Sequence, residues 1–267
     1  MSTETILIAF GLTLVAGLST GIGSMLAFFT KRTNTKFLAT SLGFSAGVMI
    51  YVSFMEMMPQ AKLNLIESFG DRIGTFYLLL AFFGGMGMIT IIDFLIPEDK
   101  NPHEMHNVEE LSKKQTGLKK TGMLVALSIG IHNFPEGIAT FTSALNSMEI
   151  ALPITAAIAI HNIPEGIAVS VPIYQATGNK KKAFWLSFLS GMAEPVGALF
   201  GFLILLPFWT PAINGFILAA VSGIMVFISI DELLPSAQKY GEHHLSISGL
   251  VGGMVIMALS LFLFIWQ

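Results

Sequence analysis

The sequence predicts an all-α, polytopic membrane protein with eight transmembrane helices. The chain has 267 residues, of which 53% are hydrophobic and only 12% are charged, and its mean hydropathy is +0.72. A soluble domain of this size needs more charge to cover its surface. The apolar residues also lie in blocks of about 20 or more, the length of helix that spans the hydrocarbon core of a bilayer. We expect one transmembrane domain covering residues 1–267.

Eight apolar blocks are separated by polar breaks. We expect spans at residues 5–29, 37–60, 74–96, 121–146, 150–176, 183–206, 212–235 and 246–266. The first block is too long for the apolar region of a signal peptide and has no basic residue before it, so we expect it to be a retained span. Residues 97–120 form the one long polar segment, and we expect a loop there rather than a domain.

Basic residues are divided unequally between the two sides of the predicted membrane. Twelve of the 14 lysines and arginines fall in the loops after the first, third, fifth and seventh spans, and only Lys62 and Arg72 fall on the other side. Loops rich in Lys and Arg stay in the cytoplasm. We therefore expect these four loops, residues 97–120 included, to be cytoplasmic and both termini to lie outside the cytoplasm.

The composition also excludes several classes of site and partner. The chain has no cysteine, so disulfides, thiolate zinc sites and thiol catalysis are excluded. No basic stretch with interleaved aromatic residues suggests a nucleic-acid partner. Membrane lipid is the expected surrounding, and the sequence leaves the oligomeric state open, with a homodimer as one alternative.

The chain contains two internal repeats. Residues 132–139, His-Asn-Phe-Pro-Glu-Gly-Ile-Ala, recur in the next span as residues 161–168, His-Asn-Ile-Pro-Glu-Gly-Ile-Ala. Residues 47–59 match residues 223–235, and these two copies lie in spans that cross the membrane in opposite directions. We expect an inverted repeat in which spans 1–3 are related to spans 6–8, with spans 4 and 5 central. This is the usual plan of alternating-access transporters with polar midplane sites.

Ionisable residues cluster in the two central spans. His132 and Glu136 lie four residues apart in the fourth span, as His161 and Glu165 do in the fifth, so each pair shares one helix face. Charged groups inside a span are costly unless they are paired or hydrated, and they mark functional sites. Imidazole together with carboxylate suits Zn²⁺, Fe²⁺ or Mn²⁺ better than Mg²⁺ or Ca²⁺. The alternative is a His–Glu pair that only holds two helices together, which the repetition disfavours.

Three further polar residues are candidates for a second, adjacent ion. Asn133 and Asn162 each follow a histidine of the repeat and could present amide oxygens; helix–helix hydrogen bonding is nearly as good an explanation of both. Glu194 lies in the sixth span, which contains no basic residue to pair with it. A carboxylate cluster without lysine or arginine cannot ionise fully when empty, so we expect a divalent ion or protons nearby.

Other candidates lie along the expected pathway. Met49 and Met225 occupy matching positions of the longer repeat and could offer thioethers, although methionine in an apolar helix usually serves packing. Four carboxylates near the ends of spans could form an entrance and an exit, or could simply be solvated helix ends: Glu56, Asp93, Asp231 and Glu232.

The paired HN-x-PEG motifs, the glutamate of the sixth span and the eight spans resemble the ZIP (Zrt/Irt-like) metal transporters over the whole chain, in particular their bacterial branch. The resemblance implies zinc import into the cytoplasm across a bacterial inner (cell) membrane. Iron, manganese, cobalt and cadmium would be further cargo, and no organic cofactor is implied. It assigns a first metal site to His132, Glu136, His161 and Glu165, and a second to Asn133, Glu136, Asn162, Glu165 and Glu194. Met49 would match a ligand that some relatives have in the second span.

Three alternatives to metal import are an intramembrane metalloprotease, a proton-coupled transporter and a metal exporter. An intramembrane metalloprotease needs an HExxH motif, which the chain lacks, so no catalytic residues and no enzyme activity are expected. A proton-coupled transporter of another cation class would not need two histidines beside two glutamates. A metal exporter is harder to separate from an importer, because direction depends on gradients and not on ligands.

Overall fold

The structure is a computed structural model that describes residues 2–27, 35–95, 118–239 and 242–265, and every regular element within these ranges is a helix. The all-α prediction is therefore confirmed for the described part of the chain. The side chains of residues 118–129 and of His132 lie outside the described part, although their backbone is described. Most of the predicted loop at residues 97–120 also lies outside the described residues.

The helices follow one another with short breaks. In chain order they are α1 (Thr3–Ala27), α2 (Thr35–Val52), η1 (Ser53–Met57), α3 (Met58–Phe69), α4 (Asp71–Leu95), α6 (Leu118–Asn146), α7 (Met148–Thr177), α8 (Lys180–Gly191), α9 (Ala193–Phe200), η3 (Gly201–Leu205), η4 (Leu206–Phe208), α10 (Pro211–Ile228), η5 (Ser229–Leu233), α11 (Leu234–Lys239) and α12 (His243–Ile265).

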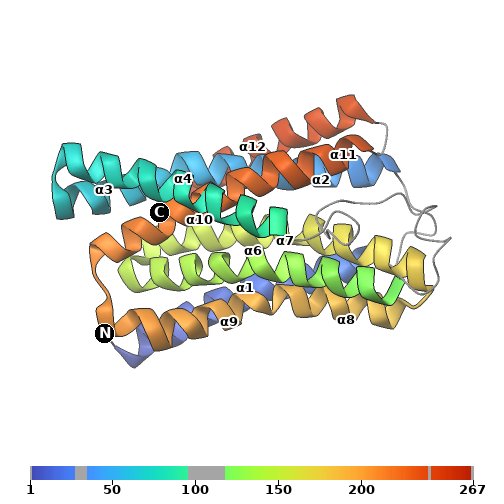
Figure 1. The fold of residues 1–267 in the computed structure, drawn as a ribbon, viewed down its shortest axis with the longest axis horizontal. Helices are drawn as coiled ribbons and strands as arrows, with labels where there is room; N and C mark the ends of the chain where they lie inside the picture. The colour runs from blue at the N-terminus through green and yellow to red at the C-terminus, as the bar shows by residue number, and fades with distance from the viewer. Residues whose placement is uncertain (1, 28–34, 96–117, 240–241, 266–267) are drawn as a thin grey trace.

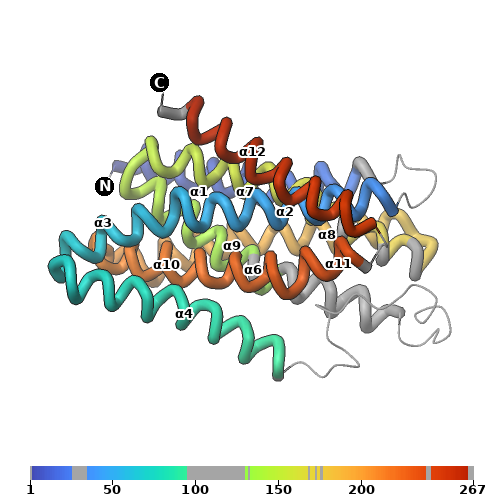
Figure 2. The backbone as a smooth tube through the Cα atoms, turned by 90° about the horizontal axis from the view of Figure 1, so that it is seen from above, coloured from blue at the N-terminus to red at the C-terminus, as the bar shows by residue number. Residues whose placement is uncertain are grey.

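Seven described helical segments are long and apolar enough to cross a membrane. These seven segments match seven of the eight predicted spans. The fourth predicted span corresponds to α6, a helix of 29 residues that is not among the seven. The start of α1 and the end of α12 lie at the same end of the molecule (Figures 1 and 2), as an even number of crossings requires. The chain is a multi-pass membrane protein by these criteria.

The second helical segment runs further than the sequence predicted. Its helix continues through α3 to Phe69, whereas the polar residues after position 60 suggested a break. In α3 the residues Ala61 and Leu65 are buried while Lys62 and Glu67 are exposed, so the polar residues form one face of a continuing helix. The helix ends at Gly70, whose φ of 78° reverses the chain.

The helices form two groups. Contacts join α1, α6, α7, α8 and α9 in one group, and α2, α3, α4, α10 and α12 in the other, and Figure 1 shows the first group below the second. The groups meet mainly where α2 packs on α7 and α10 packs on α6. The central helices α6 and α7 therefore lie at the junction of the two groups.

Two glycines bring helix backbones into direct contact around the central pair. A Cβ atom added to Gly137 of α6 would lie 2.1 Å from the carbonyl oxygen of Glu194, and one added to Gly166 of α7 would lie 2.0 Å from that of Thr20. No side chain fits such spaces, so glycine is required there. These contacts fix α9 against α6 and α1 against α7.

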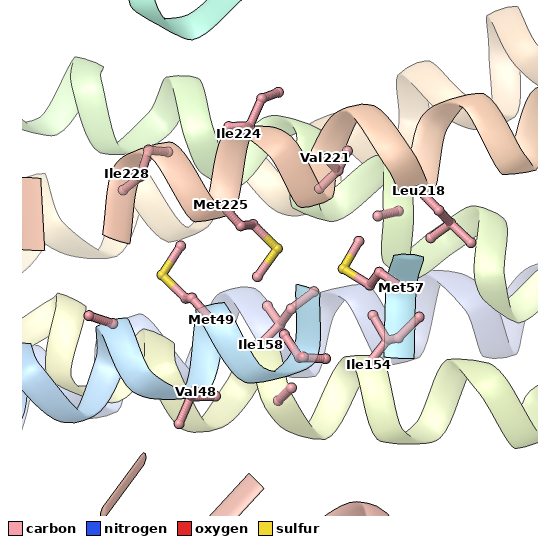
Figure 3. Close-up of a cluster of buried hydrophobic side chains, with 14 of the residues drawn as sticks. Val48, Met49, Met57, Ile154, Ile158, Leu218, Val221, Ile224, Met225 and Ile228 are labelled. Carbon is pink, nitrogen blue, oxygen red and sulfur yellow. The ribbon is translucent and has the colours of Figure 1, made fainter. Parts of the chain in front are cut away.

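An apolar cluster fills the junction between α2, α7 and α10 (Figure 3). Ile154 and Ile158 of α7 belong to it and are at most 1% exposed. Ile154 lies two helical turns before His161, and Ile158 lies one turn before it. The cluster therefore borders the central polar residues on the side of the N-terminal half of α7.

Candidate metal site between the central helices

The centre of the site is a contact between α6 and α7. The Nε2 atom of His161 lies 3.4 Å from Oε1 of Glu136, and the two side chains are 0% and 1% exposed. Each residue belongs to one copy of the short sequence repeat. An imidazole from one copy of the repeat therefore meets a carboxylate from the other copy.

Two more carboxylates lie in the same buried region. Glu165 follows His161 by one turn of α7 and is 1% exposed, and Glu194 in the first turn of α9 is 0% exposed. Oε1 of Glu194 also accepts from Asn162, the residue after His161. Three buried carboxylates from α6, α7 and α9 therefore lie around the same helix contacts.

The sequence on either side of the three carboxylates offers no basic side chain to neutralise them. Residues 121–179 and 183–238 contain neither lysine nor arginine. Buried carboxylates of like charge are strongly disfavoured unless cations or protons compensate them. The region is therefore suited to a cation.

The two asparagines use their amide groups in matching ways. Asn162 Nδ2 donates to the carbonyl oxygen of Ala16 at 3.0 Å and also to Oε1 of Glu194. Asn133 Nδ2 donates to the carbonyl oxygen of Ser190 at 3.4 Å. Both Oδ1 atoms are buried and accept no hydrogen bond from any described residue. The asparagines therefore hold helices together through nitrogen and keep their oxygens available.

Several other polar atoms in this region are buried without a hydrogen-bond partner among the described residues. They are both carboxylate oxygens of Glu136, both ring nitrogens of His161, and Oε2 of Glu194. The contact between His161 and Glu136 has the distance of an ion pair but not the geometry of a hydrogen bond. Leaving such atoms unsatisfied costs about 1–3 kcal/mol each, and a cation would satisfy several of them together.

The described ligands are not drawn together around one point. Among the described His, Asp and Glu side chains, no three are grouped closely enough to hold an ion. The predicted ligand His132 lies in α6, but its side chain is outside the described residues, so its role stays a prediction.

Comparisons with known proteins decide the family. The description of a matching family model is ZIP Zinc transporter, and the match covers residues 96–261. The chain is 60% identical over 257 residues to the zinc transporter ZupT of Streptococcus mutans, with 96% of this chain and 97% of that protein covered. The chain belongs to the ZIP zinc transporter family.

Two further relatives of the same printed name show that the similarity extends over the whole chain. The ZupT protein of Clostridium perfringens is 56% identical over 278 residues, covering 98% of each chain. That of Lysinibacillus sphaericus is 60% identical over 265 residues, covering 97% of this chain and 98% of its own. The resemblance to ZIP transporters is confirmed, and the chain is a transporter of divalent metal, zinc, and not an enzyme.

The two methionines that the sequence offered as possible ligands lie in the apolar cluster. Met49 of α2 and Met225 of α10 are both 0% exposed, and Figure 3 shows their sulfur atoms in the space between the two helices, together with that of Met57. Their surroundings are the aliphatic side chains of the cluster. The buried, apolar surroundings agree with a packing role for Met49 and Met225. A role of either sulfur as a metal ligand stays a prediction.

The four carboxylates predicted near the span ends lie outside the central helix pair. Glu56 is half-buried in η1 and Asp93 is half-buried near the end of α4. In η5, Asp231 is exposed and Glu232 is half-buried. Their proposed roles at an entrance and an exit are not tested by this arrangement.

Sequence reasoning missed the contribution of α1. Its Ala16 carbonyl holds Asn162, and its Thr20 carbonyl packs against Gly166. The first span contains no ionisable residue beyond Glu4, so a search for charge passes over it. The signal that could have revealed it is the run of small residues from Ala16 to Ser24, which is typical of close helix packing in membranes.

Proposed function

We propose that this ZIP-family protein imports zinc into the cytoplasm through a site between α6 and α7, and that it also carries Fe²⁺, Mn²⁺, Co²⁺ and Cd²⁺. The observation that supports the site is the buried contact between Glu136 and His161, with Glu165 and Glu194 beside it. Imidazole and carboxylate together favour ions of intermediate softness such as zinc. The absence of lysine and arginine from residues 121–179 and 183–238 leaves a cation as the natural compensating charge.

The site holds two adjacent ions in this proposal. The first is bound by His132, Glu136, His161 and Glu165. The second is bound by Asn133, Glu136, Asn162, Glu165 and Glu194. The available amide oxygens of both asparagines support the second set, and the two glutamates shared by the sets would bridge the ions.

We also infer that the protein is an inverted repeat about an axis in the membrane plane. Asn162 of α7 donates to the carbonyl of Ala16 in α1, and Asn133 of α6 donates to the carbonyl of Ser190 in α8. If span 4 is exchanged with span 5, and span 1 with span 6, the first of these hydrogen bonds takes the place of the second. Such an exchange is what a pseudo-two-fold axis produces.

Two other matched features support the same axis. The close contact of Gly166 with Thr20 corresponds to that of Gly137 with Glu194. The π-helical turns at Ser53–Met57 and Ser229–Leu233 lie at equivalent positions of the longer repeat. Spans 1, 2 and 6, 7 would then be related pairs, and α4 and α12 would complete the two halves.

The proposal includes a bacterial inner membrane and the orientation that the basic residues indicate. Twelve of the 14 lysines and arginines lie on one side, which we assign to the cytoplasm together with residues 97–120. Residues 1–267 act as one transporter domain in this scheme, with both termini outside the cytoplasm.

Zinc uptake by a bacterial strain that lacks its own zinc importers tests the proposal. Cells producing the unmodified protein should accumulate radioactive zinc, and cells producing Glu136→Ala should not. Glu67→Ala is the matched control, because Glu67 is an exposed glutamate of α3. Zinc uptake by Glu136→Ala at the level of Glu67→Ala, with equal amounts of both proteins in the membrane, would refute the site.

A further inference from the structure

Thr20 of α1 lies where three helices meet beside the proposed site. Its side chain is 0% exposed. Its carbonyl oxygen lies against Gly166 of α7, the residue after Glu165, and a Cβ atom added to Gly191 of α8 would lie 2.8 Å from its hydroxyl oxygen. The carbonyl oxygen of Thr20 therefore faces α7, and its buried hydroxyl lies at the contact of α1 with α8.

The Thr20 hydroxyl has no hydrogen-bond partner among the described residues. Other hydroxyls of the same helix donate to the carbonyl four residues earlier: Thr13 to Ala9 at 2.9 Å and Ser24 to Thr20 at 3.0 Å. This is the usual way in which a helix satisfies such a group.

The carbonyl that would serve Thr20 in the same way is already occupied. Ala16 oxygen accepts from Asn162 Nδ2 at 3.0 Å and from Ser19 Oγ at 2.5 Å. The same oxygen also accepts a main-chain N–H within the helix, so it has no room for a further donor and the Thr20 hydroxyl is left for a different partner.

Thr20 also occupies the position in α1 that Glu194 occupies in α9. The Thr20 carbonyl packs on Gly166 as the Glu194 carbonyl packs on Gly137. One turn earlier, Ala16 accepts from Asn162 as Ser190 accepts from Asn133. The side chain of Glu194 accepts a hydrogen bond from Asn162, the residue after His161. At the matching position in α1, the side chain is the hydroxyl of Thr20.

We propose that the Thr20 hydroxyl is an oxygen ligand of the transported ion, which it reaches directly or through one water, and that it favours Mn²⁺ and Fe²⁺ relative to Zn²⁺. This inference rests on the proposed function of the α6–α7 site. Zinc is satisfied by four ligands that include imidazole. Manganese prefers six oxygen-rich ligands, so an additional neutral oxygen contributes more to its binding.

The experiment compares manganese and zinc uptake by the purified protein in proteoliposomes. Thr20→Val removes the hydroxyl and keeps the shape, and Thr20→Ser keeps the hydroxyl. Thr13→Val is the control, because it removes a buried hydroxyl of the same helix that already has a partner. The ratio of manganese to zinc uptake should fall about tenfold in Thr20→Val, the scale of one lost polar contact to a charge, and should be kept in Thr20→Ser and Thr13→Val.

Equal loss of both metals in Thr20→Val, or an unchanged ratio, overturns the proposal. Thr20→Ala cannot overfill the helix junction, and its uptake ratio decides the question if Thr20→Val does not reach the membrane. Glu136→Ala is measured in parallel. Transport retained by Glu136→Ala refutes the proposed site itself, whereas loss in Glu136→Ala with an unchanged ratio in the Thr20 variants refutes only the role of Thr20.

Discussion

The imidazole of His161 meets the carboxylate of Glu136 across the interface of α7 and α6, with 3.4 Å between Nε2 and Oε1. The two residues come from different copies of one sequence repeat, so neither helix can build this contact alone. Both atoms are buried, and neither has a hydrogen-bond partner among the described residues. Metal binding at this place would therefore join α6 to α7 and would depend on both copies.

Glu136 and Glu165 should matter more for transport than either histidine. Each carboxylate serves both ions of the proposed pair and supplies neutralising charge. Uptake of every metal by Glu136→Ala or Glu165→Ala should fall about tenfold or more, because a charge contact in a buried site exceeds the ~1.4 kcal/mol that a factor of ten requires. The variants His132→Ala and His161→Ala should lose Zn²⁺ and Cd²⁺ uptake most. Radiolabelled uptake at matched membrane levels measures both effects.

Near-normal transport by both glutamate variants would remove the case for a metal site between α6 and α7. The exposed Glu67→Ala substitution again serves as the control for loss of a glutamate that has no role in the site.

Glu194→Gln should change selectivity. Glutamine keeps an oxygen that accepts from Asn162 but removes one charge from the proposed oxygen-only site. Iron and manganese prefer oxygen donors more strongly than zinc does, so their uptake should fall further than that of zinc. Competition uptake of zinc against iron or manganese checks this. If all three fall by one factor, Glu194 has a structural or proton-coupling role instead.

The orientation of the chain can be tested with single cysteines, because the natural chain has none. Glu67 and Lys181 are both exposed and lie on opposite sides in the proposed topology. In intact cells a cysteine at position 67 should react with a membrane-impermeant thiol reagent, and one at position 181 should react only after the cells are opened. The reverse pattern would overturn the assignment of the cytoplasmic side.

Gly166→Ala should destabilise the protein and abolish uptake. Its new methyl group would lie 2.0 Å from the Thr20 carbonyl oxygen, so α1 and α7 must separate, at a cost of about 1–3 kcal/mol or more. Gly11→Ala in α1 is the control, because nothing lies within 4 Å of its added Cβ atom. Thermal melting in detergent and zinc uptake are the measurements. Equal melting temperatures of the two variants would show that the contact is less tight than described.

Apolar blocks of the sequence predicted the helical segments because lipid requires length and apolarity from each of them. The prediction that failed was the end of the second segment, where Lys62 and Glu67 suggested a loop but occupy the exposed face of α3. The π-helical turns were also not predicted. Each of the three in the described residues ends with a bond from the residue before a proline, Met58, Leu206 or Leu234, to the carbonyl five residues earlier. Pro59, Pro207 and Pro235 lack the N–H that a regular helix would use, and a wider turn accommodates them.

At the site, the spacing of His161 and Glu165 and its repetition in α6 indicated the two central helices as the place of the candidate ligands. A carboxylate in a span without a basic residue also indicated Glu194. The hydrogen bonds of Asn133 and Asn162 to main-chain carbonyls could not be predicted, because every residue has a carbonyl and its accessibility depends on how closely the helices approach. Thr20 lies in the run of small residues of α1, which indicates close helix packing but does not distinguish its hydroxyl from the others in the run.

Ala16 contributes to the proposed site through its carbonyl oxygen, which accepts from Asn162. A systematic alanine scan would pass over this position, because alanine is already the natural residue. Glycine there would keep the same acceptor, so even a truncating substitution would leave the bond in place. One wall of the site is thus built from main-chain atoms that mutagenesis cannot delete, and its importance would show only through substitutions that displace the whole helix.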